Sequence, residues 1–169
     1  MSSSSRLRAA FAALAVACLA AACGFHLRGD VAYGFATIFV NSPTPQPIVT
    51  ELKRFLDASS STRLVDSAKD AAVTLDIVNV VDDKGVLSLS SGGRVREYAL
   101  TKRVSFRLSD KEGRDWIPAG EIVIRRSFTF NESEVLARES EETRVLRDMQ
   151  SDAVQQIIRR LQAARKPIA

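Results

Sequence analysis

A stretch of strict alternation over residues 95–109 constrains the fold of this 169-residue chain more than any other feature. Apolar and polar side chains alternate along it, which is the period of a strand with one buried and one solvent-facing side. One face carries Tyr98, Leu100, Val104, Phe106 and Leu108, and the other carries Glu97, Thr101, Arg103, Ser105, Arg107 and Ser109. We therefore expect an antiparallel sheet that is covered on one face only.

The rest of the chain supplies more strands and two amphipathic helices, whose apolar residues recur at three- and four-residue steps. Strands are predicted at 36–40, 72–81, 95–109 and 119–130, and helices at 48–58 and 141–164. A polar step, DDKG at 82–85, follows the strand at 72–81 and precedes the segment VLSLS. The order β–α–β–β–β–α predicts an α+β two-layer sandwich, with two helices on one face of a four-stranded, mostly antiparallel sheet. The first strand can pair in either direction.

The N-terminal residues predict export and lipidation. Arg6 and Arg8 precede fourteen uncharged residues, 9–22, which are too few to span a bilayer but typical of a signal peptide. Small alanines lead directly to Cys23, as in the lipobox of bacterial lipoproteins. We expect a signal peptide at 1–22, a tether at 23–35 lipidated on Cys23, and a single domain at 36–165. The alternatives are cleavage at Cys18 and an ordinary secreted protein.

Cleavage before Cys23 would leave no free thiol, because Cys18 is removed and Cys23 is committed to a thioether. This excludes an intramolecular disulfide and a cysteine metal site. The charge balance also falls, from 24 basic and 20 acidic residues to 22 and 20, a formal charge of +2. A balance so near neutral argues against nucleic-acid binding, which usually needs a strongly basic domain.

No enzyme signature is present, and we expect no catalytic residue, cofactor or metal. The single histidine, His26, lies in the predicted tether, and GxSxG, HExxH and Walker A motifs are missing. Carboxylates near the start of the last helix are favourable at a positive helix N-terminus; they are Glu132, Glu134, Glu139, Glu141 and Glu142. Binding is therefore the better hypothesis than catalysis.

Several basic residues stand at positions that a generic sandwich does not require. Arg94 and Arg96 flank a predicted hairpin tip at 90–94, whose paired glycines can adopt positive φ. Lys102 and Arg126 fall on the apolar faces of their strands, where a charge is costly without a partner. Arg138 follows the polar bend after the last strand. These residues are either solvated charges or a surface for anionic groups such as phosphates, which arginine binds well.

Short motifs along the chain resemble one family. They are CGFHLRG (23–29), EY (97–98), RSFTFN (126–131), VLAR (135–138) and QQIIRRL (155–161). Together with the order of the elements, they resemble the LPS-assembly lipoproteins of Gram-negative outer membranes, the LptE or RlpB family. The resemblance implies a non-enzymatic partner that plugs the lumen of the β-barrel LptD as a heterodimer, assists its assembly and binds lipopolysaccharide. It points to Arg94, Arg96 and Arg138 as lipopolysaccharide contacts.

The same resemblance implies an outer-membrane location, lipid-anchored, with the domain in the periplasm or inside the barrel lumen. Gly24 agrees with this, because aspartate at that position retains lipoproteins in the inner membrane of some bacteria. A competing hypothesis is a lipoprotein that binds ligands or carries lipid for an envelope transporter, which would need an enclosed apolar cavity. An envelope hydrolase would need a nucleophile–base pair that the sequence lacks.

Overall fold

The computed structural model describes residues 32–129 and 135–167, with the backbone alone for 135–139. The strands are β1 (Thr37–Asn41), β2 (Arg63–Leu64), β3 (Val73–Leu89), β4 (Val95–Asp110) and β5 (Asp115–Thr129), and the helices are α2 (Pro47–Asp57) and α3 (Val135–Ala163). The predicted signal peptide, Cys23 and most of the tether lie outside the described residues.

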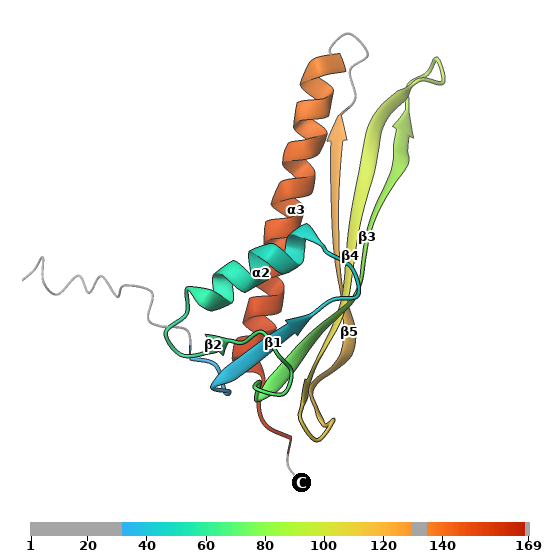
Figure 1. Cartoon of the computed structure of the whole chain (residues 1–169). Coiled ribbons are helices and arrows are strands. Elements are labelled where there is room, and N and C mark those ends of the chain that lie inside the picture. The colour runs from blue at the N-terminus through green and yellow to red at the C-terminus, as the bar shows by residue number, and fades with distance from the viewer. Residues whose placement is uncertain (1–31, 130–134, 168–169) are drawn as a thin grey trace, which may run out of the picture.

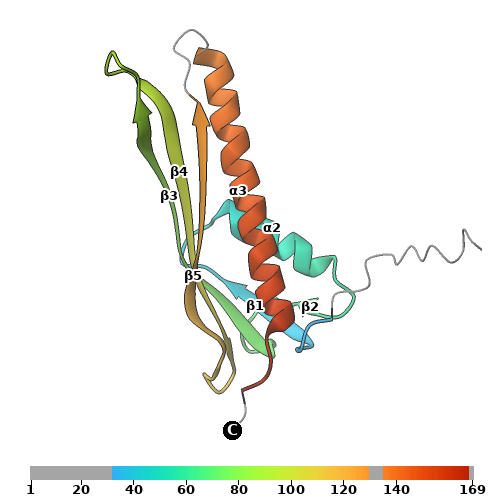
Figure 2. The same ribbon diagram turned by 180° about the vertical axis from the view of Figure 1, so that it is seen from behind.

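The described strands form one sheet in the order β2-β1-β3-β4-β5. β1 runs parallel to both β2 and β3, while β3, β4 and β5 pair antiparallel. The parallel pairing of β1 with β3 follows from α2, because parallel neighbours need a crossover connection and α2 supplies it. Both helices lie on the same side of the sheet (Figures 1 and 2). The predicted two-layer α+β class is confirmed.

The prediction of four strands was wrong, because β2 adds a fifth between the first helix and the second predicted strand. The Arg63 amide donates to the Ala36 carbonyl at 2.9 Å, and the Val65 amide donates to the Ile38 carbonyl at 3.0 Å. These bonds hold the chain beside β1 as it returns from α2. A strand of two residues is too short to show a period of two, so hydrophobic patterning does not reveal it.

The predicted end of the second strand at residue 81 was also wrong, since β3 runs through the polar step at 82–85 without interruption. Each aspartate meets a cation of β4: Asp82 pairs in register with Lys102, and the carboxylate of Asp83, which lies opposite Thr101, forms an ion pair with Arg103 at 2.6 Å. Opposite charges across an antiparallel pair stabilise the sheet. The polar run is therefore part of the ladder rather than a turn.

Apolar side chains from both layers form one core. The predicted burial of one face of β4 is confirmed, because Leu100, Val104, Phe106 and Leu108 are buried while Arg107 on the other face is exposed. The prediction was wrong for Ser109, which was expected on the solvent-facing side but is buried. Proline at the first turn of α2 suits a helix start, and this helix buries Ile48, Leu52 and Leu56. From α3 the core receives Met149, Ala153, Val154, Ile157, Ile158 and Leu161.

The molecule is elongated, and its two ends differ in thickness (Figure 1). At one end β1, β2 and α2 add to the sheet and to the helical layer. Since β1 pairs with β3 only as far as Asp76, the other end consists of β3, β4, β5 and the first half of α3. Residues 84–98, where β3 turns into β4, are called the distal hairpin from here on.

Candidate functional site

The distal hairpin ends in a tight three-residue turn. The Ser90 amide donates to the Arg94 carbonyl at 2.7 Å, and the Gly93 amide donates to the Ser90 carbonyl at 2.9 Å. Gly93 has a φ of 78°, while Gly92 does not have a positive φ. This is the three-residue hairpin connection in which a turn is followed by one left-handed residue. The sequence therefore predicted the tip correctly, but only one of the two glycines needs its conformational freedom.

Three large apolar side chains are exposed on this hairpin. Val86, Leu87 and Leu89 are 54%, 55% and 57% accessible to solvent. The β3–β4 register shifts between Val86 and Ser88 and again between Ser88 and Leu89. Bulges of this kind leave residues outside the regular alternation, so a buried face does not continue to the tip. Apolar residues gathered on one exposed element are a feature of interaction sites.

Two of the three predicted arginine contacts lie on the same hairpin. Arg94 and Arg96 are both exposed. Together with the exposed apolar side chains, they give the tip an amphiphilic surface that combines cations with aliphatic groups. Arg138 belongs to α3, but its side chain lies outside the described residues, as does His26. The apolar part of the surface was not predicted, since VLSLS alternates like a core strand.

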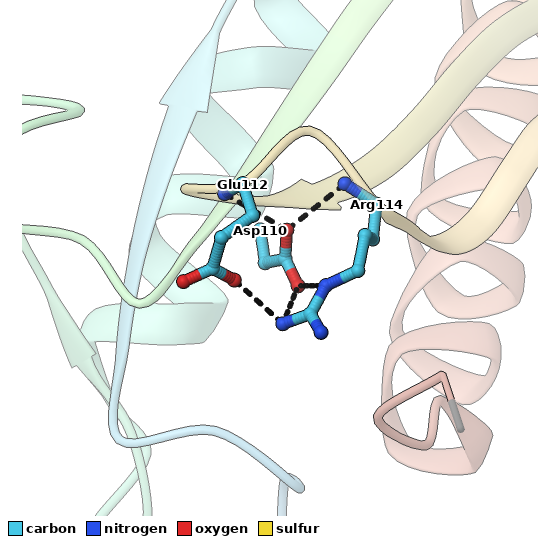
Figure 3. Close-up of polar contacts among 3 residues, drawn as sticks. All are labelled: Asp110, Glu112 and Arg114. Carbon is cyan, nitrogen blue, oxygen red and sulfur yellow. Dashed lines mark hydrogen bonds and ion pairs between the residues drawn. The ribbon is translucent and has the colours of Figure 1, made fainter. Parts of the chain in front are cut away.

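The turn at the opposite end of β4 shows what an arginine does when it is structural (Figure 3). Asp110 accepts hydrogen bonds from the Arg114 amide at 2.9 Å and from Arg114 Nε at 2.9 Å. Burial alone would raise the pKa of Asp110, but the backbone and side-chain hydrogen bonds of Arg114 outweigh burial and lower that pKa. Glu112 holds the same guanidinium at 2.5 Å. The Arg114 side chain thus stabilises the turn to which it belongs.

The two turns have the same geometry and differ in charge. Ser90 occupies the position that corresponds to Asp110. Its hydroxyl oxygen accepts a hydrogen bond from the Arg94 amide at 3.1 Å, and the Asp110 carboxylate accepts the equivalent hydrogen bond from the Arg114 amide. A hydroxyl provides no negative charge for the guanidinium. Ser90 therefore holds the backbone of the first turn but does not bind the guanidinium, as Asp110 does in the second turn.

The cations on the helix-facing side of the sheet are paired with carboxylates. Lys102 is only 4% exposed, and its Nζ lies 2.6 Å from Asp82. Arg126, predicted either to lie beyond the helices or to meet an anion, lies 2.6 Å from Asp152 of α3. Lys84 forms an ion pair with Glu142 of α3. For Lys102, the buried cation of the three, charge pairing compensates the cost that an isolated buried charge would have.

The helix-free side of the sheet carries cross-strand ion pairs. Arg103 lies 2.6 Å from Asp83, and Arg107 lies 3.0 Å from Asp76. Asn41 adds a hydrogen bond of 2.8 Å to Asp76. Cross-strand pairs of this type stabilise a solvated sheet face.

The described hollows of the surface lie away from the distal hairpin. One is lined mainly by hydroxyl and charged residues of the segment that joins α2 to β2, and another lies beside the Asp110–Arg114 turn. Within the described ranges, three or more histidine, cysteine or acidic side chains do not gather as they would around a metal ion. None of the described helices is both long and apolar enough to cross a membrane.

Comparison with known proteins identifies the family. The family model described as "LptE: Lipopolysaccharide-assembly" matches residues 35–161, which include the whole distal hairpin. This chain belongs to the LptE family. It is 28% identical over 146 residues to the LPS-assembly lipoprotein LptE of Pectobacterium atrosepticum, covering 85% of this chain and 78% of that protein. The LptE of Photorhabdus laumondii is 27% identical over 144 residues, with coverage of 83% and 78%.

A solved structure agrees with this LptE assignment. An uncharacterized lipoprotein B from Nitrosomonas europaea is 35% identical and superposes with a TM-score of 0.71, covering 80% of this chain and 88% of that one. The rare lipoprotein B of Shewanella oneidensis, 24% identical with a TM-score of 0.62, shares the fold. The resemblance that CGFHLRG and the later motifs predicted is therefore confirmed at the level of the LptE family.

Proposed function

We propose that this protein is a lipid-anchored outer-membrane component of lipopolysaccharide assembly that binds lipopolysaccharide through its distal hairpin. The main observation in support is that the same hairpin exposes three aliphatic side chains and two arginines: Val86, Leu87, Leu89, Arg94 and Arg96. Lipopolysaccharide is an acylated and phosphorylated sugar lipid. Aliphatic side chains fit its acyl chains, and the arginine fork binds phosphate oxygens in pairs.

The partner in this proposal is the β-barrel LptD, with the present domain as a plug in its lumen. The ion pairs on the helix-free sheet face support this arrangement, because the lumen of an outer-membrane barrel is polar. The Asp83–Arg103 and Asp76–Arg107 pairs hold cations and carboxylates on that face in a fixed order. A face with both cations and carboxylates can form ion pairs with side chains of either charge in the barrel lumen. Cys23 would supply the membrane anchor, since several acyl chains on one cysteine give stable attachment.

The competing hypothesis of a lipid carrier needs an enclosed apolar cavity. The hollow beside β2 is lined mainly by polar side chains such as Asp57, Ser59 and Arg63. The apolar surface of the hairpin lies outside, on an exposed tip. These observations favour binding at a surface over enclosure of a lipid.

Charge reversal at the tip tests the ligand. The double substitution Arg94→Glu and Arg96→Glu is expected to weaken lipopolysaccharide binding at least tenfold, because hydrogen bonds to charged groups contribute roughly 1.5–3 kcal/mol each. Binding of purified lipopolysaccharide to the full chain can be measured by surface plasmon resonance at fixed salt. Arg159→Glu, which changes an exposed arginine in the other half of α3, is the control and should bind as the wild type does. Unchanged binding by the double variant would show that the two arginines are merely solvated.

A further inference from the structure

Helix α3 attaches to the sheet differently along its two halves. From Met149 onward it buries a continuous apolar stripe in the core. In residues 140–148, by contrast, no side chain is buried, and the apolar contribution comes from Val145 and Leu146, which are partly covered. Since burial of apolar area provides most of the packing energy, this first part of the helix is held more weakly than the second.

The sheet beneath this weakly held part is apolar. Leu100 of β4 is 2% exposed, and Phe128 of β5 is 6% exposed. The ring of Tyr98 stacks on Phe128, with a centroid separation of 5.6 Å and an interplanar angle of 27°. Ile124 continues the strip toward the core at 4% exposure. The sheet therefore has an apolar strip here that the first half of α3 shields from water.

Cations border the strip on both sides. Lys84 of β3 and Arg126 of β5 both pair in register with Leu100 of β4, so they lie about 10 Å apart with an apolar residue between them. Lys84 Nζ also lies 4.5 Å from the centroid of the Tyr98 ring. Carboxylates of α3 occupy both cations, Glu142 on Lys84 and Asp152 on Arg126. In this closed arrangement the helix supplies carboxylate oxygens where a phosphorylated lipid would supply phosphate oxygens.

We propose that residues 140–148 of α3 are a displaceable lid over a second lipid-binding site. A lipid phosphate competes with Glu142 for Lys84, and an acyl chain lies on the strip formed by Leu100 and Phe128. Arg126 keeps its ion pair with Asp152, which lies beyond the lid. The inference rests on the proposed function and adds a site to it, separate from the Arg94–Arg96 tip. The Lys84–Glu142 pair adds little to the closed arrangement, because partly exposed ion pairs contribute little. The acyl chain covers the apolar strip that opening would otherwise expose to water.

Amide hydrogen exchange and lipid binding test the lid. Glu142→Gln removes the charge that holds Lys84, so we expect exchange in residues 140–148 to rise two- to fivefold and lipid A binding to tighten by the same factor. Glu141→Gln is the matched control, because Glu141 pairs with Arg144 within the helix at 2.6 Å. Equal behaviour of the two variants would overturn the lid. Inorganic phosphate and vesicles of zwitterionic phosphatidylcholine are the comparison probes, and exchange driven by either alone would overturn the requirement for a lipid with an anionic phosphate.

A cross-link provides a test that does not depend on the stability of a charge variant. Val86→Cys with Glu142→Cys, joined by a short bismaleimide, should bind lipid A at least tenfold more weakly than the same chain capped with N-ethylmaleimide. Val86 lies two residues after Lys84 on the same face of β3, so this variant keeps Lys84 itself. Equal binding by the two forms would overturn the lid. If the Arg94→Glu, Arg96→Glu variant then still lost binding, the proposed function would stand without the lid. A wild-type chain that failed to bind lipid A would overturn both.

Discussion

Replacing Val86, Leu87 and Leu89 together by serine is expected to weaken lipopolysaccharide binding about a hundredfold. Each side chain is more than half exposed in the free protein, so contact with acyl chains would bury the remaining area. Full burial of such a side chain is worth roughly 1.5–3 kcal/mol, and half of that is about 1 kcal/mol each. Isothermal titration with lipopolysaccharide at constant salt measures the loss.

The same substitutions are expected to leave the fold intact, because exposed positions contribute within about 0.5 kcal/mol. Val78→Ser with Val123→Ser is the control: these residues are 53% and 41% exposed and lie outside the distal hairpin. The control should keep full affinity. If it lost as much binding as the triple variant, the apolar surface of the hairpin would not be the specific contact.

The second large effect concerns Lys102, the buried cation of β4. Asp82→Asn is expected to destabilise the protein by about 1–3 kcal/mol, since breaking a buried pair costs roughly 3–5 kcal/mol and the side chain of Asp82 is 47% exposed, which allows water to screen it. Lys102→Met is expected to be neutral or stabilising, because an apolar residue of similar shape removes the desolvation cost together with the pair. Urea unfolding of both variants measures the difference.

The adjacent pair on the opposite face is the control for this experiment. Asp83 and Arg103 follow Asp82 and Lys102 in sequence on the same two strands, but their side chains are 54% and 41% exposed. Asp83→Asn should therefore cost less than about 0.5 kcal/mol. A Lys102→Met variant less stable than Asp82→Asn would mean that the lysine stem packs in a way that methionine cannot reproduce.

Local patterns predicted those parts of the fold that rest on long periodic segments. The alternation of β4 and the three- and four-residue spacing of the helices were read correctly. The two residues of β2 have no period, and the strand continues through the polar step at Asp82–Gly85 because cations on β4 compensate the charges of its aspartates. Those pairings are long-range, so the neighbouring sequence does not reveal them.

The sequence predicted the arginines of the candidate site but not its exposed apolar residues. Arg94 and Arg96 stand out because cations beside a glycine turn are visible in the sequence. The exposure of Leu87 and Leu89 depends on the register shifts of β3 and on the absence of covering elements at that end of the described sheet. Apolar residues in an alternating segment are predicted to be buried, and only the tertiary structure shows whether another element covers them.

The most direct measurement of the central claim is purification of the full chain from native membranes after gentle detergent extraction. If the protein is an LPS-assembly plug, a β-barrel several times its mass should co-purify with it in a stable, equimolar complex that resists high salt. Mass spectrometry should identify that barrel as LptD, and lipopolysaccharide should be detectable in the complex. Recovery of the chain alone, from cells in which the barrel is present, would contradict the account.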